Sequence, residues 1–260
     1  MRKIQSLGAF EALQSRRTFL GTLAGASAFA IGGCACPFGR QKVRLAAVGI
    51  MGKGFSDWFP MVQSGLAELV ALCDADRGQL RKAQETVNKR GLPLDLSRLP
   101  FYTDSRRLLD DAAKLGIEAM TVSTPDHMHA PIAIRAMKAG IHVYVQKPLV
   151  RTLWELDYFR RTAAENAGGH GDEVAISIEP NAHYVEFLRA IRGEGDVYVD
   201  THSRCFSDVE HSVPMMEGIL VGCAAQLTPG VLAWDSAAQR FDNADANALI
   251  RPYVRPGWEF

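Results

Sequence analysis

Residues 43–54 read Val-Arg-Leu-Ala-Ala-Val-Gly-Ile-Met-Gly-Lys-Gly. The first six form a short apolar run typical of a buried strand, and the glycines after them are typical of a tight turn. A helix is expected from Phe55 to Ser64, followed by a second buried strand from Glu68 to Cys73 that ends at Asp74. Strand, glycine turn, helix, strand and terminal acid make up the first unit of a Rossmann domain.

The glycine turn departs from the usual Gly-x-Gly-x-x-Gly pattern. Aligned on that pattern, the three positions are Gly49, Met51 and Gly54, so methionine replaces the glycine that normally lets a pyrophosphate approach bare backbone. Gly52 takes over this role if the turn is shifted by one residue. Asp74 lies 20 positions after Gly54, where a carboxylate accepts hydrogen bonds from ribose hydroxyls and repels a 2′-phosphate. The pattern therefore predicts NAD in preference to NADP.

Alternating helices and strands continue beyond this unit. Helices are expected at 75–90, 105–115 and 129–139, and strands at 101–104, 118–123 and 141–145. Such alternation predicts a parallel sheet with helices on both faces and right-handed crossovers. The expected fold class is α/β, with a doubly wound Rossmann domain over residues 39–150 and a truncated α+β region over residues 151–260.

Two later segments resemble the Gfo/Idh/MocA family of NAD(P)-dependent oxidoreductases, which act on sugars, inositols and related polyols. The first reads TPDHMHA at residues 124–130, and the second reads HVYVQKPL at residues 142–149. Family members carry Glu-Lys-Pro where this chain has Gln146-Lys147-Pro148. The resemblance runs from about Val43 to Arg161, and residues 234–259 look like the C-terminus of exported members. It implies hydride transfer between a nicotinamide and a sugar, inositol or related polyol.

The resemblance also implies roles for individual residues. Lys147, at the carboxyl edge of the sheet, would hold a substrate hydroxyl and stabilise the alkoxide as hydride leaves. The cofactor contacts implied by these two motifs are Thr124, Pro125, His127 and Gln146. His127 and His129 form a His-x-His pair that can bind metal, but no third ligand stands at a recognisable spacing. We therefore predict no metal site and favour loop-to-helix packing for the pair.

The chain after Lys147 looks too short for the second, substrate-binding domain that the resemblance implies. That domain supplies an aspartate and a histidine about four residues apart, and no Asp-x-x-x-His occurs after Lys147. We expect a strand at 174–178 and helices at 154–165, 184–191 and 213–227, with most of the central sheet deleted. The last helix has a wide apolar face that needs a cover, and strands near Trp234 and Phe241 are expected to have lost their neighbours. The remaining histidines are interpreted as surface, helix-cap or junction residues: His170, His183, His202 and His211.

Residues 1–38 are interpreted as an export signal and excluded from the fold. The twin arginine in the run Ser15–Leu20 stands directly before an uncharged run of small and apolar residues, 21–33, which is typical of twin-arginine signals. Residues 31–34 also look like a lipobox that would make Cys34 a lipid anchor, whereas residues 28–30 offer a plain cleavage site. The expected location is periplasmic, either free or as a membrane-anchored lipoprotein.

Composition excludes several classes of protein. Lys plus Arg and Asp plus Glu number 29 each, so no basic surface predicts nucleic-acid binding. Five cysteines in 260 residues do not form a disulfide framework. Three interpretations are left: an exported oxidoreductase, a non-catalytic nucleotide-binding remnant, and a scaffold that docks a partner. The substrate and the oligomeric state stay open.

Overall fold

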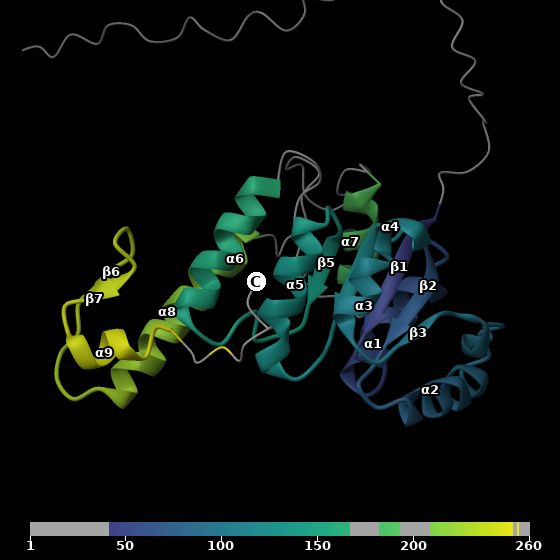
Figure 1. Cartoon of the computed structure of the whole chain (residues 1–260), viewed down its shortest axis with the longest axis horizontal. Helices are drawn as coiled ribbons and strands as arrows, with labels where there is room; N and C mark the ends of the chain where they lie inside the picture. The colour runs from purple at the N-terminus through teal and green to yellow at the C-terminus, as the bar shows by residue number, and fades with distance from the viewer. Residues whose placement is uncertain (1–41, 167–181, 193–208, 252–253, 255–260) are drawn as a thin grey trace, which may run out of the picture. The chain divides into compact units, whose positions relative to one another are not determined.

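The centre of the fold is a five-stranded parallel sheet. The computed structural model describes residues 42–166, 182–192, 209–251 and 254. Its strands are β1 (Val43–Val48), β2 (Ala67–Cys73), β3 (Phe101–Tyr102), β4 (Ala119–Val122) and β5 (His142–Val145). They lie in the order β3-β2-β1-β4-β5, so the direction of winding reverses between β1 and β4 (Figure 1). The predicted α/β class is therefore confirmed.

Helices cover both faces of the sheet, as the strand pattern requires. One face carries α1 (Lys53–Gln63), α2 (Gly78–Lys89) and α7 (Ala182–Ile191), and the other carries α3 (Ser105–Asp110), α4 (Ala112–Leu115) and α5 (His129–Lys138). Successive side chains of β1 alternate between the faces. Leu45 joins the cluster that contains Trp58 and Phe187, and Ala46 joins the cluster that contains Ile134.

The register of the strands brings their last residues to one line. Val48 pairs with Cys73 on one side and with Val122 on the other, and Val122 pairs with Val145. The residues that follow these strand ends therefore meet at the carboxyl edge of the sheet, and they are Gly49, Asp74, Ser123 and Gln146.

Short acidic side chains shift several element boundaries from the prediction. The helix expected from residue 75 begins at Gly78, because the carboxylates of Asp74 and Asp76 accept the backbone N–H groups of Asp76 and Gly78 in two successive turns. The helix expected over 105–115 is divided at Asp111, whose carboxylate accepts the Tyr102 hydroxyl at 2.7 Å. The helix expected from Phe55 begins at Lys53. The strand expected at 174–178 lies outside the described residues.

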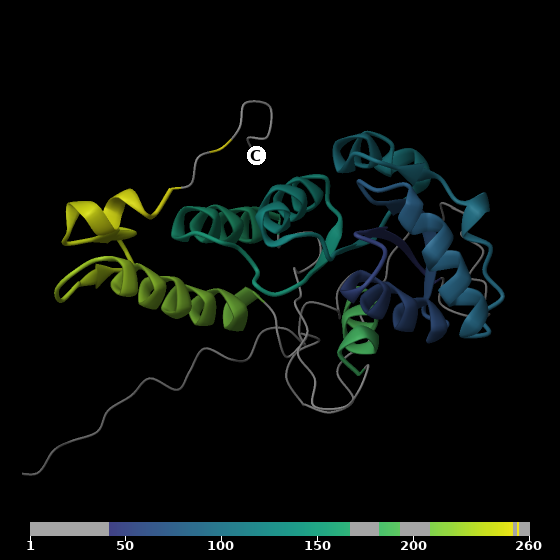
Figure 2. The ribbon, with the colours of Figure 1, turned by 90° about the horizontal axis from the view of Figure 1, so that it is seen from below.

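The region after the Rossmann unit consists of packed helices and a small hairpin. Helix α6 (Leu153–Asn166) packs against α5 and against α8 (Val209–Leu227), which begins four residues before the expected helix (Figures 1 and 2). The apolar face of α8 is divided: Val213 and Met216 are buried, whereas Met215 and Ile219 are 55% and 52% exposed. None of the helices within the described ranges is long and apolar enough to span a membrane.

The two C-terminal strands pair with each other, although we expected them to have lost their neighbours. They are β6 (Trp234–Asp235) and β7 (Arg240–Phe241), and the antiparallel pair precedes α9 (Ala244–Ala248). The Asn247 side chain accepts from the Phe241 N–H at 2.8 Å and donates to the Phe241 carbonyl at 2.9 Å. This side chain occupies the edge of the short hairpin.

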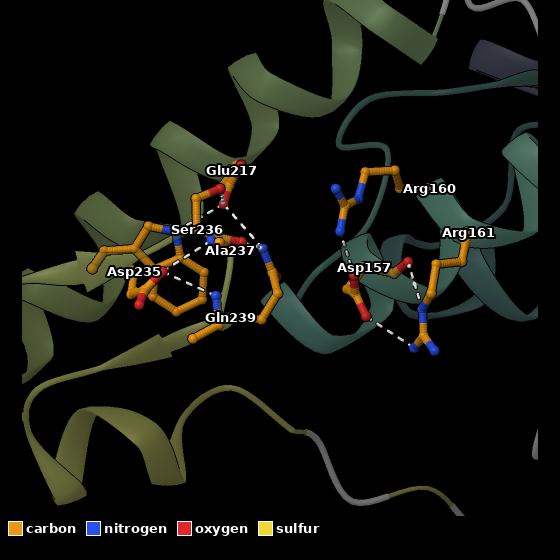
Figure 3. Close-up of polar contacts among 10 residues, drawn as sticks. Asp157, Arg160, Arg161, Glu217, Asp235, Ser236, Ala237 and Gln239 are labelled. Atoms are coloured by element: carbon orange, nitrogen blue, oxygen red, sulfur yellow. Dashed lines mark hydrogen bonds and ion pairs between the residues drawn. The ribbon is translucent and has the colours of Figure 1, made fainter.

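A carboxylate on α8 forms hydrogen bonds with this hairpin. Glu217 accepts hydrogen bonds from Trp234 Nε1 at 2.7 Å, Ser236 Oγ at 2.6 Å and Gln239 Nε2 at 3.2 Å (Figure 3). Burial alone would raise the pKa of Glu217, but these three hydrogen bonds outweigh it, and Arg160 on α6 adds a smaller attraction. The net result is a pKa below the usual value, so the folded state favours the ionised form.

Glu217→Gln is expected to lower the melting temperature by roughly 3 °C near neutral pH, because the hydrogen bonds lose their charge assistance. Because the pKa of Glu217 is lowered in the folded state, its ionisation stabilises the protein at pH values above the usual glutamate pKa. This stabilisation is lost as the pH falls through the pKa of the folded state. The difference from wild type should therefore shrink on acidification. Thermal unfolding over a pH series measures it, with the exposed Glu165→Gln as control. A difference that does not vary with pH would contradict the assignment.

Candidate functional site

A cavity of about 950 Å³ opens at the carboxyl edge of the sheet, over the ends of β1, β2 and β4. It lies at the point where the strand order reverses, which is where doubly wound sheets bind their ligands. Seven of the ten predicted site residues line it: Gly49, Met51, Gly52, Asp74, Thr124, Pro125 and His127.

The three glycines of the turn have two different tasks. A Cβ atom on Gly49 would lie 2.3 Å from the Ser123 carbonyl oxygen, and one on Gly54 would lie 1.8 Å from the Gly49 carbonyl oxygen. These two residues therefore allow the close packing of the turn. Gly52 has a φ of +61° and open space where a Cβ would stand, and it caps the N-terminus of α1. The opening next to the helix thus lies at Gly52, as expected for a turn shifted by one residue.

Met51 stands beside that opening, where the usual pattern has glycine. Its side chain is partly buried and packs against the apolar cluster that contains Trp58 of α1. Part of it also reaches the cavity wall. The bare backbone at Gly52, and not the Met51 position, is therefore the place where an anionic group can approach the first turn of α1.

Asp74 is held at the cavity by two backbone groups. Its Oδ2 atom accepts the Ile50 N–H at 3.1 Å, which attaches the carboxylate to the glycine turn, and its Oδ1 atom accepts the Asp76 N–H at 3.0 Å. Each oxygen keeps lone pairs for another donor. The neighbouring Cys73 thiol has its pKa raised to about 12 by burial and by the nearby carboxylates of Asp74 and Asp104. It is therefore a protonated, unreactive part of the cavity wall.

The loop after β4 presents a hydroxyl that has no partner in the described part of the chain. Thr124 Oγ1 is buried and makes no hydrogen bond there, and Thr124 lines the cavity. An orphaned buried hydroxyl usually marks a place where a ligand or a water completes the bonding. Together with the opening at Gly52 and the carboxylate of Asp74, it fits the hydroxyl-rich and anionic parts of a dinucleotide.

The loop-to-helix packing predicted for the His127 and His129 pair is found for His129 and is wrong for His127, which is exposed at the cavity. The His129 ring is buried, with Nε2 at 2.8 Å from the Thr124 carbonyl oxygen and Nδ1 at 2.7 Å from the Pro148 carbonyl oxygen. It thereby ties together the two motifs that carry the family resemblance. Among the residues with described positions, no three His, Cys, Asp or Glu side chains gather as metal ligands.

The remaining three predicted residues lie outside the cavity wall. Gly54 packs within the turn, as described above, and Gln146 is buried and donates from Nε2 to the Asp57 carboxylate at 3.1 Å. Lys147 is exposed at the end of β5, before a cis peptide bond to Pro148, and no described side chain or backbone group pairs with its ammonium. Its charge is therefore available to a ligand at this edge.

The sequence prediction missed Asp57, a fully buried carboxylate beside this edge. The only signal for it was the i,i+4 spacing from Lys53, which pairs with it at 2.8 Å. His183 was expected at the surface or at a helix cap, but it is half-buried on α7 against the rings of Tyr144 and Tyr184. Burial, followed by repulsion from Lys53, lowers the pKa of His183 against the attraction of Asp57. His211 is exposed on α8, and His170 and His202 lie outside the described residues.

Comparison with known proteins finds a family that matches the Rossmann part of the chain. Residues 43–168 match the model of an oxidoreductase family with an NAD-binding Rossmann fold, Gfo/Idh/MocA. A glycosyl hydrolase family 109 protein of Stenotrophomonas maltophilia is 33% identical over 220 residues, which cover 82% of this chain and 40% of the relative. An alpha-N-acetylgalactosaminidase of Shewanella oneidensis is 31% identical over 115 residues, covering 44% of this chain and 24% of the relative.

Solved structures of related fold also match. One is scyllo-inositol dehydrogenase of Lactobacillus casei with bound NAD(H) and scyllo-inositol, at 18% identity and a TM-score of 0.43, covering 51% of this chain and 36% of that one. The chain spans between 24% and 40% of the length of the curated relatives named above. The parallel sheet with a cavity at its switch point has the Rossmann topology, and residues 43–168 are similar to the NAD-binding domain of the Gfo/Idh/MocA oxidoreductase family.

Proposed function

We propose that this protein binds NAD along the carboxyl edge of the sheet and transfers hydride between it and a sugar or related polyol. The observation that carries the proposal is the cavity itself, because one wall combines an open glycine at a helix N-terminus, a fixed carboxylate and an unpaired hydroxyl. These are the groups that a pyrophosphate and two riboses require.

Each group has a defined task in this proposal. The first turn of α1, open at Gly52, holds the pyrophosphate, and Asp74 accepts the adenosine ribose hydroxyls and disfavours a 2′-phosphate. Thr124 and Pro125 orient the nicotinamide ribose. Lys147 holds the reacting substrate oxygen and stabilises negative charge on it. When bound, the nicotinamide supplies the hydride acceptor.

The sugar substrate is proposed partly from the names of the curated relatives, which are glycosyl hydrolases. Those names also favour a second candidate function, the NAD-dependent cleavage of a glycosidic bond. The chain spans at most 40% of either relative. The two candidates share the cofactor site and differ in whether reduced cofactor accumulates.

Calorimetric titration of NAD and NADP into the folded chain tests the shared site. NAD is expected to bind with about micromolar affinity and NADP more weakly. Asp74→Ser is expected to weaken NAD binding about tenfold, because a charge-assisted hydrogen bond is lost. NADP binding should be weakened less, because the repulsion between the carboxylate and the 2′-phosphate is lost as well. A folded chain without affinity for either nucleotide would contradict the proposal and favour the scaffold interpretation.

Turnover assays then separate the enzymatic candidates. Absorbance of NADH with a panel of polyols and sugars reports net hydride transfer, and release of nitrophenol from a nitrophenyl N-acetylgalactosaminide reports glycoside cleavage. Nitrophenol release that requires NAD, without NADH accumulation, would favour the second candidate. NAD binding without either reaction would favour a non-catalytic nucleotide-binding remnant.

We further propose that the chain is exported by the twin-arginine route, on the evidence of the residues 15–33. The location would be periplasmic, with Cys34 as a lipid anchor if the lipobox is used. Arg16→Lys with Arg17→Lys should retain the protein in the cytoplasm, and Cys34→Ala should release it from the membrane fraction.

A further inference from the structure

A fully buried carboxylate lies directly behind the cofactor edge. Asp57 of α1 has no exposed surface, and four side chains donate to it. Lys53 Nζ at 2.8 Å, Tyr184 OH at 2.8 Å and Gln146 Nε2 at 3.1 Å reach its Oδ1 atom, and Ser123 Oγ at 2.6 Å reaches its Oδ2 atom. Ionised carboxylates are seldom buried without such compensation, because desolvation of the charge costs several kcal/mol.

The donors come from four separate elements that the carboxylate joins. Lys53 is on α1 itself, and Tyr184 is on α7, which packs beside α1 (Figure 2). Ser123 follows β4 and lines the cofactor cavity, whereas Gln146 follows β5 and directly precedes Lys147. Asp57 thus bonds the ends of two adjacent strands at the place where the nicotinamide half of the site is proposed.

We propose that Asp57 is a positioning residue that holds the ends of β4 and β5 in register for the cofactor, with Gln146 as its obligatory uncharged partner. The expected effect on NAD binding rests on the proposed function. The pairing of Asp57 with Ser123 and Gln146 rests on their hydrogen bonds alone. Asp57 is not among the residues that line the cofactor cavity. It acts through Ser123, which lines the cavity wall, and through Gln146, which fixes the backbone before Lys147.

The charges around Asp57 determine how many negative charges positions 57 and 146 can carry together. The Lys53 ammonium is half-exposed and is the single full cation bonded to Asp57 among the described side chains. The Tyr184 hydroxyl accepts from Lys53 Nζ at 3.3 Å and donates to Asp57. The His183 ring packs on Tyr184, on the side of α7. One negative charge is therefore balanced here, and a second at position 146 would have no cation of its own.

An exchange of the two side chains tests the proposal. Asp57→Asn should weaken NAD about tenfold and lower the melting temperature by about 10 °C. Gln146→Glu puts two carboxylates in contact, so near pH 8 it should also weaken NAD binding about tenfold. This loss should disappear as the pH falls, because the two carboxylates then share a proton. The double variant again has one carboxylate and one amide, and should bind NAD within about threefold of wild type at every pH.

Glu155→Gln is the matched control, since Glu155 is a buried carboxylate on α6 that accepts the Arg151 and Thr152 backbone N–H groups and pairs with the Arg151 guanidinium at 3.8 Å. It should lower the melting temperature without changing NAD affinity. The proposal is overturned if the folded double variant binds NAD no better than Asp57→Asn, or if Gln146→Glu equals wild type throughout the pH series. A wild-type chain without NAD affinity would remove the proposed function, while the melting temperatures of the same variants would still decide the pairing.

Discussion

Gly54→Ala is expected to weaken NAD binding by at least about 100-fold, equivalent to ~2.7 kcal/mol, and to lower the melting temperature by about 10 °C. The added methyl group would lie 1.8 Å from the Gly49 carbonyl oxygen, which is backbone and not a flexible side chain. Gly49 is itself confined, with a φ of +78° and the Ser123 carbonyl beside it. The clash can be relieved only by separating the start of α1 from the end of β1, which displaces the cavity wall.

Two other glycines make the result interpretable. Gly65 has a φ of +78° and open space around it, and it lies away from the cavity, so Gly65→Ala should cost about 1 kcal/mol of stability and leave NAD affinity unchanged. Gly52→Ala should cost a similar amount of stability but also weaken NAD, since its side chain would enter the cavity opening. Calorimetry and thermal unfolding measure all three. NAD affinity near the wild-type value in Gly54→Ala would contradict the role assigned to the turn.

The fold could be predicted from the sequence because its signals are local. The apolar runs that became β1, β2, β4 and β5 are each four to seven residues long and are separated by helical periods, a pattern typical of a parallel sheet. The glycine turn and Asp74 follow two of these strands directly, so their convergence at one edge follows from the parallel arrangement. Two of the boundaries that differ from the prediction, at Gly78 and Asp111, depend on aspartate side chains that bond to nearby groups, and periodicity does not report these bonds.

The polar network behind the site could not be predicted in the same way. Tyr184 and Gln146 reach Asp57 across 127 and 89 positions of sequence, and nothing in their local patterns relates them. In the sequence, Asp57 looks like an exposed member of an i,i+4 pair with Lys53, although it is fully buried. Its burial follows from the packing of α7 on α1, which only the tertiary structure reveals.

Lys147→Met is expected to reduce kcat/KM by about 100- to 1000-fold for whichever reaction the assays reveal, because the group that stabilises charge on the reacting oxygen is removed. The same change should leave the melting temperature within about 1 °C of wild type, since exposed side chains without partners contribute little to stability. Within the described part of the chain, the Lys147 side chain is exposed and its ammonium has no partner.

The combination of these two results is what distinguishes a catalytic lysine from a structural one. Lys147→Arg keeps the charge but replaces a compact ammonium by a planar group, so it should recover only part of the loss. Lys114→Met removes the same charge from an exposed position on α4 and should change neither quantity. Unchanged turnover in Lys147→Met would assign the reacting oxygen to another group. A fall in NAD affinity alone would make Lys147 a cofactor contact, because loss of ground-state binding raises KM and leaves kcat intact.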